Sequence, residues 1–240
     1  MLVRNSATTL VNIRRRARRL EAAGRLIEAE GEYRRLLQSA SSVPGRGADR
    51  DRARMVRNAS RMHWLGSRFD SAAFGFASLL KEARARGRPE DPMALVWRYL
   101  SLARLDPAAA LAELRQRPPM AHAHRGSWAA SILELFCGRM PPAEFSASVA
   151  ALRARTSPRV TPHVAPHVAN RQMGDLPRSA RVAAAIENFY LGQWCLLHGH
   201  ALAARMHLSA AAGLGGKFES CAAAVERQRL QAGHVAGTRA

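Results

Sequence analysis

Two histidines in the stretch TPHVAPHVAN, His163 and His167, have the residue type and spacing that could bind a metal ion. On a helix, histidines four positions apart share one face and could bind zinc together. Pro162 and Pro166 disfavour a helix here, and no cysteine or acidic residue lies close by in the sequence. We therefore expect neither a metal site nor another cofactor.

The glycine-rich residues 213–220, GLGGKFES, could do chemistry of a different kind, because glycine-rich loops bind phosphates in nucleotide-binding proteins. The stretch lacks the P-loop spacing and the serine or threonine that follows the P-loop lysine, so we predict a turn between helices. The GxSxG nucleophile motif is also absent from the sequence. We predict no catalytic residues and expect that the protein is not an enzyme.

The net charge of the chain is unusual. Lysine and arginine together number 37 and acidic residues 18, which gives a formal charge of +19, and 35 of the basic residues are arginine. A GC-rich genome explains arginine in place of lysine, but it does not explain the shortage of acidic residues. A field this positive should attract an acidic protein, nucleic acid or a membrane surface.

The three cysteines, Cys137, Cys195 and Cys221, lie far apart in apolar contexts, without a CxxC motif. Buried free thiols are the expected state, so nothing indicates an oxidising compartment. No apolar stretch approaches the roughly 20 residues of a membrane span, and arginines follow the first residues where a signal peptide would have its cleavage site. We expect a cytoplasmic protein, or a periplasmic one if the true start lies upstream.

Helices must position the arginines, because alanine is abundant and aromatic residues make up only 6% of the chain. In residues 189–211, FYLGQWCLLHGHALAARMHLSAA, the spacing of small and apolar residues predicts two short antiparallel helices. Gly192 would allow a close approach of the second helix, and Gly199 would end the first. The buried face of the second helix is predicted to hold Ala204, Leu208 and Ala211.

Similar patterns recur along the chain and predict an all-α solenoid of about five helix pairs with a closing C-terminal helix over residues 217–231. Asp106 is predicted to cap one helix, and Gly138 to end another. The expected loops span residues 39–51 and about 156–179, the latter rich in proline and histidine. We predict one domain over residues 1–231 and a flexible tail over 232–240.

The pattern Gly192, Gly199, Ala204, Leu208 and Ala211 resembles the tetratricopeptide repeat, and so does the N-terminal series Gly24, Ala29, Tyr33 and Leu36. This resemblance implies that the first helix of each pair lines a concave surface that binds peptides or proteins.

A narrower resemblance, over the C-terminal two-thirds, is to bacterial tetratricopeptide adaptors of the new-lipoprotein-I type. It is carried by ALVWRYLSLARLDPAAALAEL, WAASILELFCGRM and NFYLGQWCLLHGHALAARMHLSAA. These stretches supply mostly core residues. The resemblance implies an adaptor for periplasmic hydrolases, provided that an export signal lies upstream of the present start.

The repeat register places seven residues on the groove side of the first helices. They are Arg14, Arg18, Arg54, Arg57, Arg61, Phe189 and Gln193. Five of the seven are arginines, whose guanidinium groups bind carboxylates and phosphates in a bidentate manner. The alternative is a solvated basic face without a dedicated ligand.

Three functions follow from these observations. The first is a non-enzymatic scaffold that binds a protein or peptide, acidic rather than basic, in its concave groove. The second is a nucleic-acid-associated protein that uses the arginine-rich surface of residues 14–19, RRRARR. The third is the periplasmic hydrolase adaptor. Few aromatic residues are available to stack on bases, which favours the first function over the second.

Overall fold

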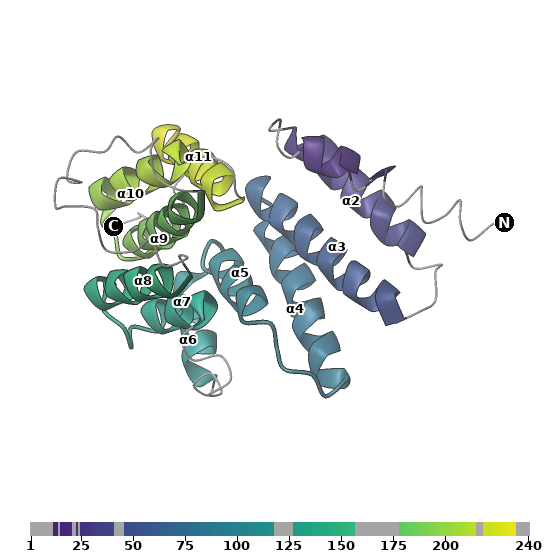
Figure 1. The fold of residues 1–240 in the computed structure, drawn as a ribbon, viewed down its shortest axis with the longest axis horizontal. Helices are drawn as coiled ribbons and strands as arrows, with labels where there is room; N and C mark the ends of the chain where they lie inside the picture. Colours follow the sequence, from purple (N-terminus) through teal and green to yellow (C-terminus); the bar gives the residue numbers. More distant parts are fainter. Residues whose placement is uncertain are drawn as a thin grey trace. The chain divides into compact units, whose positions relative to one another are not determined.

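The computed structural model describes residues 12–13, 15–20, 23, 25–40, 46–117, 127–156, 178–214 and 218–233, and every structural statement below refers to these. They form helices and turns without a strand, so the prediction of an all-α fold is confirmed (Figure 1). Contacts divide the chain into two compact units, residues 1–110 and 111–240, whereas one domain was predicted over residues 1–231.

Unit 1 contains a helical segment over residues 15–20 and four longer helices. These are α2 (Leu26–Ala40), α3 (Arg46–Leu65), α4 (Phe69–Ala85) and α5 (Pro92–Leu102). Consecutive helices of these four pack against one another, α2 against α3, α3 against α4 and α4 against α5, as expected for a solenoid. The helix α6 (Pro107–Gln116) runs across the point at which the two units divide.

Unit 2 contains five further helices. They are α7 (Trp128–Phe136), α8 (Pro142–Thr156), α9 (Arg178–Leu197), α10 (Ala201–Gly213) and α11 (Phe218–Gln231). Consecutive packing holds here too, from α7 to α8, α8 to α9, α9 to α10 and α10 to α11. The predicted closing helix is therefore present as α11.

Short local signals set several helix ends. The Asp106 carboxylate accepts a hydrogen bond from the Ala109 backbone N–H at 2.9 Å, which confirms the predicted cap. Gly138 and Gly199 have φ values of +74° and +76°, in the left-handed region that favours glycine at the end of a helix. Both glycines follow a helix as predicted.

The predicted loop over residues 39–51 is too long, because α2 continues to Ala40 and α3 begins at Arg46. Beyond Pro44 the sequence RGADRDR contains charged residues that tolerate a helix, and Gly47 lies in the first turn, where it costs little. Of the predicted loop over 156–179, residues 157–177 lie outside the described residues, as does most of the predicted tail.

A group of aromatic side chains forms the core of unit 1. Trp64 of α3 and Trp97 of α5 are fully buried, and their rings meet edge to face with centroids 5.2 Å apart. Phe76 of α4 stacks on Trp97 at 6.5 Å. Because these rings come from three successive helices, they fix the positions of α3, α4 and α5 relative to one another.

The contact between α9 and α10 forms the core of unit 2 at the position that the glycine pattern predicts. A Cβ added to Gly192 would lie 2.8 Å from the Cγ atom of Leu208, so glycine is required for this approach. Ala204, Leu208 and Ala211 are fully buried. The predicted register of this helix pair is confirmed.

Candidate functional site

Three predicted site residues, Arg54, Arg57 and Arg61, lie on one side of α3 because they are spaced by three and four positions. We call these three residues the α3 arginine face. All three side chains are half-buried. The neighbouring helix α5 sets the orientation of two of them.

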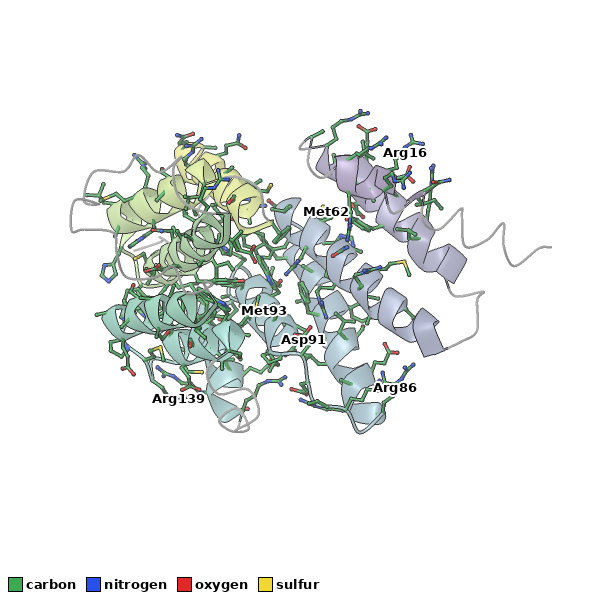
Figure 2. The ribbon with its side chains drawn as sticks, in the orientation of Figure 1. Arg16, Met62, Arg86, Asp91, Met93 and Arg139 are labelled. Carbon is green, nitrogen blue, oxygen red and sulfur yellow. The ribbon has the colours of Figure 1, made fainter. Side chains whose placement is uncertain are left out.

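Arg57 binds a carboxylate of its own chain. Its Nη2 donates to Oδ2 of Asp91 at 2.5 Å, and each of the two side chains is 35% exposed. The other carboxylate oxygen of Asp91 accepts from the Met93 backbone N–H at 3.0 Å, which caps α5. Asp91 therefore joins α3 to the first turn of α5 (Figure 2).

Arg61 lies one turn further along α3 and packs on an aromatic ring of α5. Its guanidinium carbon is 5.6 Å from the centroid of Trp97, within the range of a cation–π interaction. Arg104 makes a similar contact with Trp64 at 6.0 Å. Contacts with α5 thus restrict the rotamers of both Arg57 and Arg61 before any ligand binds.

The α3 arginine face continues into a region of mixed charge. A pocket of about 140 Å³ beside Arg57 is lined by Arg86 and Arg88, but also by Asp91 and Glu82. Arg86 donates to Glu82, with Nη2 and Oε1 2.7 Å apart. The expected row of guanidinium groups is therefore interrupted by carboxylates from the end of α4 and the start of α5. The sequence near the arginines does not predict that these carboxylates lie beside them.

Of the two predicted N-terminal arginines, Arg14 lies outside the described residues and Arg18 is exposed. Arg15 and Arg19 are exposed as well, on the same side of the helical segment as Arg18, while Ala17 and Leu20 are buried. Arg16, which follows Arg15 in the sequence, forms an ion pair with Glu32 of α2, with Nε and Oε1 3.4 Å apart (Figure 2).

Phe189 and Gln193, predicted to face the groove, are 0% and 1% exposed. That prediction is wrong, because α9 is contacted by α7, α8, α10 and α11 and has little free surface at these positions. The Phe189 ring packs edge to face on Tyr190 with centroids 5.0 Å apart. Both side chains belong to the core of unit 2.

A buried ion cluster that the sequence analysis did not predict joins α2 to α3 and the turn after it. Glu30 of α2 is buried and pairs with Arg34 at 2.6 Å and with Arg68. His63 Nδ1 lies 3.7 Å from the same carboxylate. Burial and the charge of Arg34 nevertheless lower the pKa of His63, so its imidazole is neutral at pH 7.

The described residues contain no group of three or more histidine, cysteine or acidic side chains that could hold a metal ion. His163 and His167 lie outside them. Burial raises the pKa of the Cys137 and Cys195 thiols, so neither is an activated nucleophile. No described helix has the length and apolar character needed to cross a membrane.

Asp91 is the residue of this site that the sequence analysis missed. The signal was present in the dipeptide Asp91–Pro92, since an acidic residue before a first-turn proline is typical of a helix cap. What the sequence could not indicate is that the second carboxylate oxygen reaches Arg57, 34 positions away.

No protein-family model matches the chain, and no curated protein matches it significantly. A function can therefore be proposed only from the sequence and the geometry of the site.

Proposed function

We propose that the protein is a non-enzymatic scaffold that binds an acidic segment of a partner protein through the α3 arginine face. One observation supports this proposal above the others. The guanidinium of Arg57 already binds a carboxylate, and that of Arg61 is held one turn away by an indole ring. A carboxylate of a partner would meet guanidinium groups whose rotamers these contacts already restrict, and at Arg57 it would have to share or displace the bond to Asp91.

The charge distribution also supports an acidic partner. Of the 37 basic residues, 22 lie in residues 1–110, together with 11 of the 18 acidic residues. Unit 1 therefore has a large positive excess, which raises the local concentration of acidic ligands and weakens with salt. The tetratricopeptide relationship remains a proposal, and under it this side of α3 would line the concave surface.

A nucleic-acid-associated function is the second candidate, and the exposed side of residues 15–20 favours it. Arg15, Arg18 and Arg19 share that side, and no ion pair with another described residue engages them. Arginines in this arrangement could neutralise successive phosphates of a nucleic acid backbone. The two candidates use different surfaces, so substitutions can separate them.

The proposed function can be tested with a fluorescein-labelled glutamate-rich peptide and a single-stranded oligonucleotide, measured by fluorescence anisotropy at low salt. The test variant carries Arg54→Gln, Arg57→Gln and Arg61→Gln. A matched control in unit 2 carries Arg115→Gln, Arg117→Gln and Arg181→Gln. Arg117 makes the control close, because it pairs with Glu113 at 3.6 Å as Arg57 pairs with Asp91.

We expect the test variant to bind the peptide at least tenfold more weakly, which corresponds to about 1.4 kcal/mol, and the control to change affinity by less than threefold. Equal losses in both variants would mean that net charge alone attracts the peptide. Tight binding of the oligonucleotide, lost on changing Arg15, Arg18 and Arg19 to glutamine, would favour the second candidate.

A further inference from the structure

A groove on unit 1 lies between α3 and α4, apart from the α3 arginine face. Its volume is about 600 Å³, and its lining includes Val56, Ser60 and His63 of α3 with Asp70, Phe74 and Gly75 of α4. The two helices approach closely at its floor, where a Cβ on Gly75 would overlap with the hydroxyl of Ser60. Because Ser60 and Gly75 are small, the larger side chains on either side of them form the walls of the groove.

The groove has an unusual composition for this protein. Phe74 on its rim is 76% exposed, although phenylalanine is more often buried. Asp70 is exposed, and the groove lining contains no lysine or arginine among the described residues. The groove lining therefore combines apolar and small polar side chains with one carboxylate, while Arg34 and Arg68 lie next to it in the ion cluster around His63 and Glu30.

The exposed side of α10, in unit 2, has the complementary composition. Leu202 and Met206 lie one turn apart and are 74% and 67% exposed. Arg205 lies between them in the sequence and is also exposed. The opposite side of this helix is held in the core by Ala204, Leu208 and Ala211, so the exposed side is rigid.

We propose that the exposed side of α10 in one molecule docks into the α3–α4 groove of a second copy. Leu202 and Met206 would cover Val56 and Phe74, and Arg205 would pair with Asp70. The described residues include five large hydrophobic side chains that are strongly exposed, and three of them, Phe74, Leu202 and Met206, lie on these two surfaces. An apolar pair one turn apart is also the pattern by which helices bind grooves.

This contact joins two different surfaces, so a dimer keeps one unoccupied groove on one molecule and one unoccupied α10 side on the other. Such a heterologous interface can add further copies until a ring closes or a chain grows. The docking surfaces are small, which predicts weak association in the micromolar range or above. The proposal goes beyond the binding of an acidic partner and does not depend on it.

The net charge of +19 sets the salt dependence of the association. Long-range repulsion between two such molecules opposes contact and is screened by salt, whereas a single Arg205–Asp70 pair contributes little. Association should therefore strengthen between about 0.05 M and about 0.5 M salt. Binding of an acidic peptide should weaken over the same range, so the two interactions can be separated.

Sedimentation velocity over a range of protein concentrations tests the proposal. One variant removes the exposed ring of the groove with Phe74→Gln. Another removes the exposed apolar side chains of α10 with Leu202→Gln and Met206→Gln. Glutamine adds no charge, and its helix propensity is similar to that of leucine and methionine and higher than that of phenylalanine, so the helices should be retained; circular dichroism checks the fold. Leu105→Gln, at another exposed leucine, is the control and should behave like the wild type.

We expect the wild type to associate as concentration rises and each variant alone to stay monomeric. Mixed in equal amounts, the two variants should form dimers that grow no further, since each supplies the surface that the other lacks. A wild type that stays monomeric up to millimolar concentration at high salt would overturn the proposal. It would equally be overturned if the groove variant associates as the wild type does, or if the mixture stays monomeric.

Discussion

Asp91 makes two contacts, one with each oxygen of its carboxylate. One oxygen caps α5 at Met93, and the other binds Arg57 of the α3 arginine face. An acidic ligand at this face would have to compete with Asp91 for the same guanidinium. Under the proposed function, Asp91 would therefore be an internal competitor of the acidic ligand.

The substitution Asp91→Asn separates these two roles, because asparagine is a good helix cap but has no charge. We expect affinity for the glutamate-rich peptide to rise about fivefold, equivalent to roughly 1 kcal/mol for a half-exposed ion pair. Asp106→Asn is the matched control, since Asp106 also caps a helix and no described contact joins it to Arg57. If both substitutions raise affinity equally, the competition between Asp91 and the ligand is disproved.

Two histidines make the stability of the fold depend on pH. Burial lowers the pKa of His63 and of His207 from the ordinary value of 6.5, with Asp70 and Glu187 acting in the opposite direction. Because each pKa is lower in the folded chain, the unfolded chain takes up protons first as the pH falls. The contribution of the two neutral histidines to the free energy of unfolding is fully present above about pH 6.5 and is lost as the pH falls below that value.

Urea denaturation at about pH 7.5 and about pH 5 can measure this loss in the wild type and in the double variant His63→Gln, His207→Gln. The variant should lose less free energy of unfolding between the two pH values. Carboxylates titrate alike in both proteins and cancel in the comparison. Parallel losses would show that neither histidine is desolvated in the folded state.

At the scale of helices, two glycines inside helices have opposite surroundings. Gly192 of α9 faces Leu208 so closely that a Cβ would lie 2.8 Å from its Cγ atom, whereas Gly31 of α2 has nothing within 4 Å. Replacing glycine by alanine in a helix gains up to about 1 kcal/mol where space allows. At Gly192, overpacking against a buried side chain costs about 1–3 kcal/mol.

We therefore expect Gly31→Ala to raise the melting temperature and Gly192→Ala to lower it, as measured by circular dichroism. The common change in helix propensity makes each variant the control for the other. A rise in both would mean that α9 and α10 move apart at small cost, and that the glycine is not needed for their contact.

Helix ends could be predicted from the sequence where a single residue determines the backbone. Gly138 and Gly199 adopt the left-handed conformation, and Asp106 supplies the cap that its position before a proline indicates. The start of α3 at Arg46 was missed, because a helix with a glycine in its first turn has no distinct local signal.

The site could be predicted only in part, because side-chain burial depends on helices distant in the sequence. Helical spacing correctly places Arg54, Arg57 and Arg61 on one side of α3. The same reasoning failed for Phe189 and Gln193, since the helices packed around α9 cover them. A period of 3.6 residues defines the sides of a helix but not which of them meets solvent.

At the scale of the whole molecule, the positive charge has different effects on the two proposed interactions. It should attract an acidic segment to unit 1, and it should oppose the approach of identical molecules. At low salt the first effect should therefore dominate over self-association. Rising salt should reverse this order, and the two proposed surfaces lie on different parts of the chain.

The contact between Arg61 and Trp97 predicts an optical readout of the α3 arginine face. The indole is fully buried, and its excited state responds to a positive charge held over the ring. A ligand that draws the guanidinium away should change the emission of Trp97, which is one of four tryptophans in the chain. Occupancy of the α3 arginine face could then be followed by intrinsic fluorescence, without a label on either partner.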